Sequence, residues 1–300
     1  MPTKRTASVL FIFLVNTLAP ATVVLEVNKL AVSGITELQI HGKCLDIDMY
    51  GNKGDSVYMV PHEVSNSVQI KSSKSGAILT VWVENIDSPD IPFCRGTMAF
   101  TVPAGLVVDI ENKSGDISLE RVRARKVAVE NLMGSIDIDR SDAIFKIKTK
   151  AGSVDMEYCD GSMHIDTKLG QIDVEHCTGK IRATSTLGSQ DYEFIEGDLK
   201  ATSIAGSIDI DNFKGSLALI SRAGSQDGDN ITILDSAYFE TSAGSISMDF
   251  RNNLDEFTFM LASSVGSLEV GHIQSFKTLR YGEGPIPVVG ISRAGSQEYD

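Results

Sequence analysis

The sequence is poor in aromatic side chains and in the residue patterns that mark catalytic sites. Aromatic residues make up only 7% of the 300 residues, against 42% for the hydrophobic residues together. That imbalance suits a narrow core filled by isoleucine, valine, leucine and alanine. The five histidines show neither HExxH spacing nor a nucleophile–base arrangement, and no CxxC pair is present. The sequence therefore contains no constellation that predicts an enzyme.

Positive charge is also scarce. Against 40 acidic residues stand 27 lysines and arginines, which gives a formal net charge of −13 at pH 7. This balance argues against nucleic acid and against anionic membrane surfaces as partners, because both carry the same sign of charge.

A long membrane-spanning run is lacking as well. The apolar run Val9–Leu18 is short for a span, which needs about 20 residues. It follows Lys4 and Arg5 and precedes Ala19-Pro20-Ala21, a small-x-small sequence typical of cleavage sites. Residues 1–21 are therefore predicted to be a secretory signal peptide, with an uncleaved membrane anchor as the alternative. Cleavage would remove two positive charges and no acid, moving the net charge from −13 to −15, and would leave no transmembrane span.

What the sequence does contain is a regular repeat of glycine. Nine glycines stand at nine-residue intervals from Gly152 to Gly224. With the glycine counted first, the third and fifth residues of each unit are mostly apolar, and the second, fourth and sixth are mostly polar. This period of two predicts a short strand in each unit, with glycine supplying the turn. Helix is excluded here, because no apolar stripe recurs at intervals of three and four.

Alternate units differ, so the full repeat has eighteen residues and two strands. One kind of unit carries aspartate in fourth place and an acid in sixth, whereas the other mostly carries a basic residue in fourth place. A repeat of this kind predicts an all-β fold, a parallel β-solenoid (β-helix) whose coils stack about 4.8 Å apart. Residues eighteen apart should then stack, with Val154, Ile172 and Ile208 pointing inward. Gln190 and Gln226 interrupt that column and are expected to be hydrogen-bonded.

The repeat divides the mature chain into three parts of one elongated body. Residues 22–104 are β-rich with an irregular period and are expected to form imperfect coils that cap the N-terminal end. Residues 105–250 are the regular solenoid. Residues 251–300 are looser coils with two insertions, Arg251–Glu256 and His272–Pro287, which are expected to be loops. Such loops are either binding loops or plain insertions.

A family resemblance rests on the start of the regular part. The segment Phe100-Thr-Val-Pro-Ala-Gly105 leads into Val107-Val-Asp-Ile-Glu-Asn-Lys-Ser-Gly-Asp-Ile117 and then into recurring Gly-Ser-Ile-Asp. This succession resembles the bacterial family of proposed adhesins known as domain of unknown function 4097, over roughly residues 35–250. The resemblance implies a β-solenoid in an exported or surface protein, and it marks no catalytic residue.

Acidic residues recur at the eighteen-residue interval in two series. Stacking would place them in two parallel rows on one outer face, where like charges repel. The first row is Asp137, Asp155, Asp173, Asp191, Asp209 and Asp227, and the second is Asp139, Glu157, Glu175, Glu193, Asp211 and Asp229.

These rows allow two interpretations. Hard divalent cations bind carboxylate oxygens, so the face could take Ca²⁺, the one cofactor we consider. Alternatively it is a solvated acidic face that keeps the protein soluble, since the GGxGxD turn of calcium-binding β-rolls is absent. The candidate cation ligands are Asp155, Glu157, Asp173, Glu175, Asp191, Glu193, Asp209 and Asp211.

The four cysteines fall into two pairs. Cys159 and Cys177 occupy the same position in adjacent coils, where Cα atoms about 4.8 Å apart lie inside the disulfide range. An exported chain meets oxidising conditions, so a bridge is one reading, and two buried thiols filling the core are the other. Cys44 and Cys94 both lie in the N-terminal part and could form a second bridge.

These features together predict an exported, non-enzymatic β-solenoid that serves as a scaffold or adhesive binding protein, in the periplasm or at the cell surface. The expected partner is an envelope or extracellular protein or glycan. The alternative is a Ca²⁺-dependent polysaccharide lyase or hydrolase of the β-helix type. Such enzymes need a catalytic arginine or lysine beside the acids, and none stands in register with the acidic rows.

Overall fold

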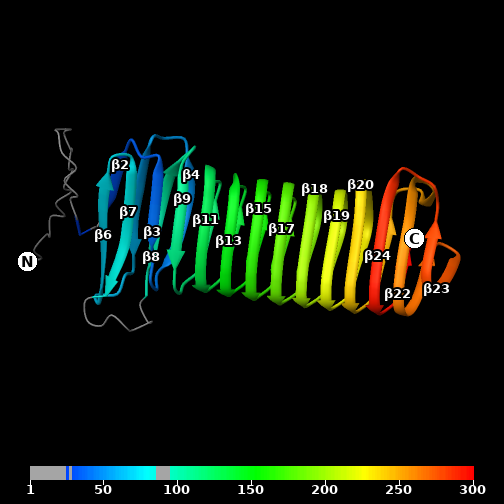
Figure 1. Cartoon of the computed structure of the whole chain (residues 1–300). Helices are drawn as coiled ribbons and strands as arrows, with labels where there is room; N and C mark the ends of the chain where they lie inside the picture. The colour runs from blue at the N-terminus through cyan, green and yellow to red at the C-terminus, as the bar shows by residue number, and fades with distance from the viewer. Residues whose placement is uncertain (1–24, 27–28, 86–94) are drawn as a thin grey trace, which may run out of the picture.

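The computed structural model describes residues 25–26, 29–85 and 95–300, which form one elongated stack of strands (Figure 1). The predicted signal peptide, residues 1–21, lies outside the described residues. Within the described ranges the chain forms no α-helix, and hence none that is long and apolar enough to cross a membrane.

The middle of the chain forms coils with two strands each, one short and one long, on opposite faces of the solenoid. The short strands are β10 (Ile117–Glu120), β12 (Ile136–Asp139), β14 (Val154–Glu157) and β16 (Ile172–Glu175). The long strands are β9 (Val107–Asn112), β11 (Arg123–Met133), β13 (Asp142–Ala151), β15 (Asp160–Leu169) and β17 (Thr178–Leu187). In the next coils both strands run together as one element, in β18 (Gln190–Ala205), β19 (Ile208–Ala223) and β20 (Gln226–Ala243).

Neighbouring coils pair in parallel and in the predicted eighteen-residue register. Val154 pairs with Ile136 on one side and with Ile172 on the other. All three side chains are fully buried, at 0% exposure, whereas the aspartate that follows each of them lies on the outer face. The predicted fold class, an all-β parallel solenoid with two strands per coil, is confirmed.

The glycine repeat has a second cause besides the turn. Gly170 has φ +150°, in the region that favours glycine. A Cβ atom at this position would collide with the backbone carbonyl of Gly152 in the coil below. The same contact recurs along the column, so close stacking of the turns requires glycine in successive coils.

The buried glutamine Gln190 is hydrogen-bonded, as predicted. Its Nε2 donates to Ser185 Oγ (2.7 Å) and to the Thr202 carbonyl oxygen (2.8 Å). Its Oε1 accepts a hydrogen bond from the Tyr192 hydroxyl at 2.7 Å. The glutamine therefore joins the short strand, across the core, to the long strands that precede and follow it.

Gln226 repeats this arrangement with one difference. Its Nε2 donates to Ser221 Oγ (3.1 Å) and to the Glu240 carbonyl oxygen (2.7 Å). Gly228 stands two positions along, where the Gln190 coil has Tyr192. Gln226 Oε1 therefore has no hydrogen-bond partner among the residues that the structure describes. The prediction of a hydrogen-bonded side chain holds here as well.

Replacing Gln190 by alanine is expected to lower the free energy of unfolding by about 1–3 kcal/mol, because Tyr192 and Ser185 each lose a buried partner. Urea unfolding followed by circular dichroism measures this loss. Gln171→Ala provides the control, since Gln171 is exposed at a turn of the same stack. Equal stability of the two variants would contradict a supporting role for the buried amide.

The N-terminal end is closed by strands that break the simple order. The coil of β3 (Glu37–His41) and β4 (Asp46–Asn52) lies between the β9–β10 coil and a later coil, β7 (Ile78–Asn85) and β8 (Thr97–Pro103). Antiparallel strands then cover the outer side of β7 and β8: β6 (Val68–Ser75), β5 (Ser56–His62), β1 (Leu25–Glu26) and β2 (Leu30–Ser33).

The C-terminal end uses a similar device (Figure 1). Three strands precede the last coil in the chain: β21 (Ile246–Phe250), β22 (Phe257–Val270) and β23 (Ile273–Tyr281). The last coil, β24 (Ile286–Ala294) and β25 (Gln297–Tyr299), lies between the β20–β21 coil and the earlier strand β22. Antiparallel β23 then closes the outer edge of β22.

The prediction of a loop over His272–Pro287 is therefore wrong, because β23 fills most of that segment. An outermost parallel strand would leave its backbone groups unpaired, and the antiparallel strand pairs them. The other predicted insertion, Arg251–Glu256, does lie outside the strands and contains the 3₁₀ turn Leu254–Glu256.

Candidate functional site

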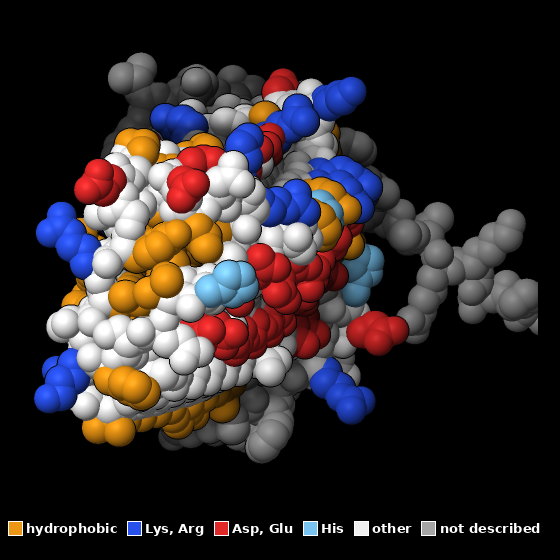
Figure 2. All heavy atoms as spheres, turned by 90° about the vertical axis from the view of Figure 1, so that its right-hand side faces the viewer, with side chains coloured by type: hydrophobic (Ala, Val, Ile, Leu, Met, Phe, Trp, Pro, Cys, Tyr) orange, Lys and Arg blue, Asp and Glu red, His pale blue; other side chains and the backbone are white. Residues whose placement is uncertain are grey.

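The two predicted acidic rows exist on the short-strand face. Asp155, Asp173 and Asp191 pair in register from one coil to the next, and so do Glu157, Glu175 and Glu193. Figure 2 shows the acidic side chains gathered in a band that runs back along the molecule. Continuation of the same register adds Asp137, Asp139, Asp209, Asp211, Asp227 and Asp229 to the band.

The crowding changes the proton affinity of the first row. Partial burial, followed by repulsion from Asp191, raises the pKa of Asp173 to about 6. The same two causes, with Asp227 added, raise the pKa of Asp209 to about 6. The pKa values of Asp137 and Asp227 are also raised, again mainly by burial.

The rows do not form a compact chelate. No group of three or more histidine, cysteine or acidic side chains within the described ranges is arranged to hold a metal ion. Each carboxylate has its neighbours along a line, whereas Ca²⁺ is coordinated by oxygens on several sides. Calcium bound as a counter-ion along the rows stays a prediction.

That prediction has a direct test. Millimolar Ca²⁺ is expected to raise the melting temperature by a few degrees more than Na⁺ at equal ionic strength, because a divalent ion binds the folded array better than the unfolded chain. Substituting Asp173→Asn, Glu175→Gln, Asp191→Asn and Glu193→Gln together should abolish the excess in a thermal-shift measurement. Equal shifts with the two salts would leave only screening, and the face would then be a solubility device.

A column of exposed aromatic rings borders the second acidic row. Tyr158, His176 and Phe194 all have left-handed backbone, with φ between 51° and 53°. Their rings stack at 4.7 and 4.6 Å between centroids. The Arg140 guanidinium lies 5.5 Å from the Tyr158 ring centroid and pairs with Asp139 at 2.5 Å. The basic side chain of Arg140 therefore does reach the second acidic row, but from the turn that follows the short strand and not from a position in register with the acids. The rings cover one another's faces and stabilise the turn.

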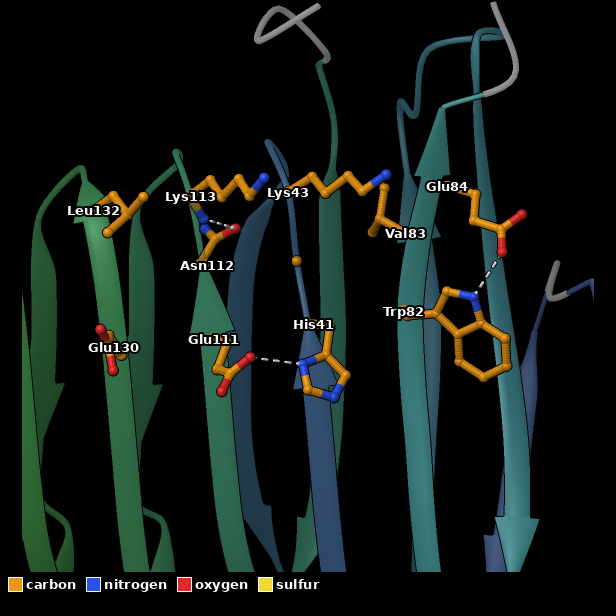
Figure 3. Close-up of a pocket in the computed structure, with 11 residues that line it drawn as sticks. His41, Lys43, Trp82, Val83, Glu84, Glu111, Asn112, Lys113, Glu130 and Leu132 are labelled. Atoms are coloured by element: carbon orange, nitrogen blue, oxygen red, sulfur yellow. Dashed lines mark hydrogen bonds and ion pairs between the residues drawn. The ribbon is translucent and has the colours of Figure 1, made fainter. Parts of the chain in front are cut away.

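A surface groove lies elsewhere, on the long-strand face near the N-terminal end of the solenoid (Figure 3). It crosses the neighbouring strands β7, β3, β9 and β11 and has a volume of about 680 Å³. In one row across these strands, His41 pairs with Trp82 on one side and with Glu111 on the other, and Glu111 pairs with Glu130. Lys43, Val83, Glu84, Asn112, Lys113 and Leu132 complete the lining with Gly42.

The polar groups of the groove are held in place by one another. The Trp82 indole Nε1 donates to Glu84 Oε1 at 3.0 Å, and Lys71 Nζ donates to Glu84 Oε2 at 2.5 Å. The Lys71 hydrogen bond, supported by that of Trp82, lowers the pKa of Glu84, which keeps this carboxylate charged. On the next strands, His41 Nδ1 lies 3.1 Å from Glu111 Oε2.

Sequence reasoning missed this groove. Its residues come from segments 41 and 70 positions apart, outside the eighteen-residue period, because β3 is inserted between β7 and β9. A signal was present in the single tryptophan of the chain, Trp82. It stands between Val81 and Val83 in the β-rich N-terminal part, and in a strand its side chain points to the face opposite theirs.

The cysteine predictions have different outcomes. Cys159 and Cys177 are free, buried thiols, so the proposed bridge between them is not formed. In parallel coils the Cβ atoms also stand about 4.8 Å apart, beyond the roughly 3.5–4.5 Å that a disulfide takes. Instead, the Cys159 amide donates to Cys177 Sγ at 3.3 Å. Cys44 is disulfide-bonded, whereas Cys94, its predicted partner, lies outside the described residues.

The fold and its surfaces define a capped parallel β-solenoid with a surface groove of about 680 Å³ on one face. A family model described as Toastrack DUF4097 matches residues 39–230, and the chain belongs to that family. No curated protein matches the chain. A solved structure from Clostridium sporogenes ATCC 15579, provisionally described as a cell adhesion protein, is similar at 11% identity, over 94% of this chain and 99% of that one. Its TM-score is 0.21, which supports no inference about function.

Proposed function

We propose that this protein is an exported, non-enzymatic scaffold of the cell envelope that binds an extracellular or envelope partner, in an adhesive role. The observation that carries the proposal is the closure of both ends by antiparallel strands. Closed ends oppose growth by strand addition and leave the long faces as the surfaces for a partner. Those faces are built from strands that pair in register from one coil to the next.

Export is proposed from the N-terminal sequence, with its basic start, apolar run and small-x-small site. The test is expression of the full chain in a bacterial host, followed by cell fractionation and intact-mass analysis. Loss of the first 21 residues and recovery in the periplasm or at the surface are expected. Retention of the full-length chain in the cytoplasm would contradict export.

Binding is tested with the exported protein itself. Cross-linking to intact cell envelopes and mass spectrometry should recover a protein or a glycan attached to the long faces. The competing function is that of a Ca²⁺-dependent lyase or hydrolase. Calcium-dependent release of unsaturated uronides from polygalacturonate or alginate would show that the protein is an enzyme and would contradict the scaffold function.

A further inference from the structure

The groove across β7, β3, β9 and β11 has the length of an extended ligand. Its row of paired residues runs from Trp82 through His41 and Glu111 to Glu130, over three strand spacings. At about 4.8 Å for each spacing, the row is about 14 Å long. A single ring would fill only one end of it, and a short chain of rings would fill it all.

The charges in the groove favour a neutral ligand. Lys43 and Lys113 lie along one edge of the groove in Figure 3. Glu111 and Glu130 lie further along the neighbouring strands β9 and β11. An anion would be repelled by the carboxylates, and a cation would be repelled by the ammonium groups. A neutral molecule rich in hydroxyl groups can accept from the lysines and donate to the carboxylates in the same pose.

The tryptophan adds an apolar platform to these polar groups. The indole N–H donates a hydrogen bond to Glu84, and Lys71 donates one to the same carboxylate. The ring therefore has a fixed orientation before any ligand binds. Figure 3 shows the indole face-on to the viewer, on the strand next to that of His41 and directed toward Glu84. A fixed ring costs little ordering entropy on binding, and its face suits the C–H surface of a sugar ring.

We propose that this groove binds a short neutral oligosaccharide, with one sugar ring on Trp82 and hydroxyl groups on His41, Glu111 and the two lysines. This inference rests on the proposed binding function and names the ligand class for it. The site has adjacent flat and polar parts, so it matches a ligand that has apolar ring faces and polar edges.

The chain's only tryptophan provides the readout, since its fluorescence reports on the groove alone. The full-length mature protein is titrated with neutral hexasaccharides of glucose, N-acetylglucosamine and mannose, and with hexamers of galacturonate and of glucosamine as charged counterparts. A saturable change in emission with a neutral hexasaccharide is expected, with weaker binding of its monosaccharide. No saturable change with any neutral hexasaccharide, or tighter binding of a charged one, overturns the proposal.

Variants locate the binding by calorimetry, which needs no tryptophan. Trp82→Ala and Glu111→Gln are each expected to weaken binding by about ten-fold or more, equivalent to about 1.4 kcal/mol. The matched controls are Phe194→Ala and Glu193→Gln, an exposed aromatic residue and an acid outside the groove, which should bind as the native protein does. Thermal melting checks that all four variants remain folded. Equal losses in groove and control variants would overturn the site.

The outcome is separable from that of the proposed function. If envelope localisation and cross-linking succeed while no neutral sugar binds, the scaffold stands and the ligand class is wrong. If sugars bind to a protein that is retained in the cytoplasm, the groove stands and the envelope role is wrong.

Discussion

Replacing Val154 by aspartate is expected to unfold the middle of the solenoid. The two side chains are similar in size, so the substitution adds a carboxyl group without much change in volume. Val154 is fully buried between Ile136 and Ile172, and no polar side chain stands next to it in that column. An unpaired carboxyl group in such a place costs several kcal/mol, and we expect a loss of more than about 3 kcal/mol.

The effect should spread beyond one coil, because each coil is stabilised only by its two neighbours. Urea unfolding and limited proteolysis measure the loss and locate the new cleavage sites. Asp155→Asn is the control, since Asp155 is the next residue and lies on the outer face. We expect that control to be neutral or slightly stabilising. Native-like stability of Val154→Asp would disprove the inward register of the whole column.

The regular coils are predictable from sequence because every pairing there joins residues eighteen apart. Once the glycine period sets the coil length, alternation alone decides which side chains point inward. Ile172 and Asp173 illustrate this, since the first is buried and the second lies outside, as the pattern requires. The polar Gln190 was also placed, because a buried amide must find partners.

The ends are different, because their pairings are not local. Nothing in the sequence of β24 indicates that it lies between β20 and β22 rather than after β22. The same holds for β3, which lies between β7 and β9. The groove depends on this insertion, since it brings His41 beside both Trp82 and Glu111. A local period identifies neighbours only where chain order and stacking order agree.

Lowering the pH from 7 to 5 is expected to stabilise the protein, because of the first acidic row. The pKa values of Asp173 and Asp209 are about 6 in the folded chain, against an ordinary value of 3.8. Between these two values the folded state binds more protons than the unfolded state, so stability rises as pH falls through about 6. The gain is complete once the pH is below the unfolded value. Glu84 acts in the opposite direction, but only near and below its ordinary value of 4.5, because its pKa is lowered.

The double variant Asp173→Asn and Asp209→Asn should reproduce this gain at pH 7 and remove most of the pH dependence between 7 and 5. Both carboxyl groups are only half-buried, so solvent screening limits the gain to about 1 kcal/mol or less for each. In a chain of this size, each kcal/mol of added stability raises the melting temperature by about 2–4 °C. Asp166→Asn on the long-strand face is the matched control and should keep the native pH profile. Melting curves at closely spaced pH values test this prediction. A steady loss of stability of the native protein from pH 7 to 5 would show that repulsion within the first acidic row does not destabilise the fold.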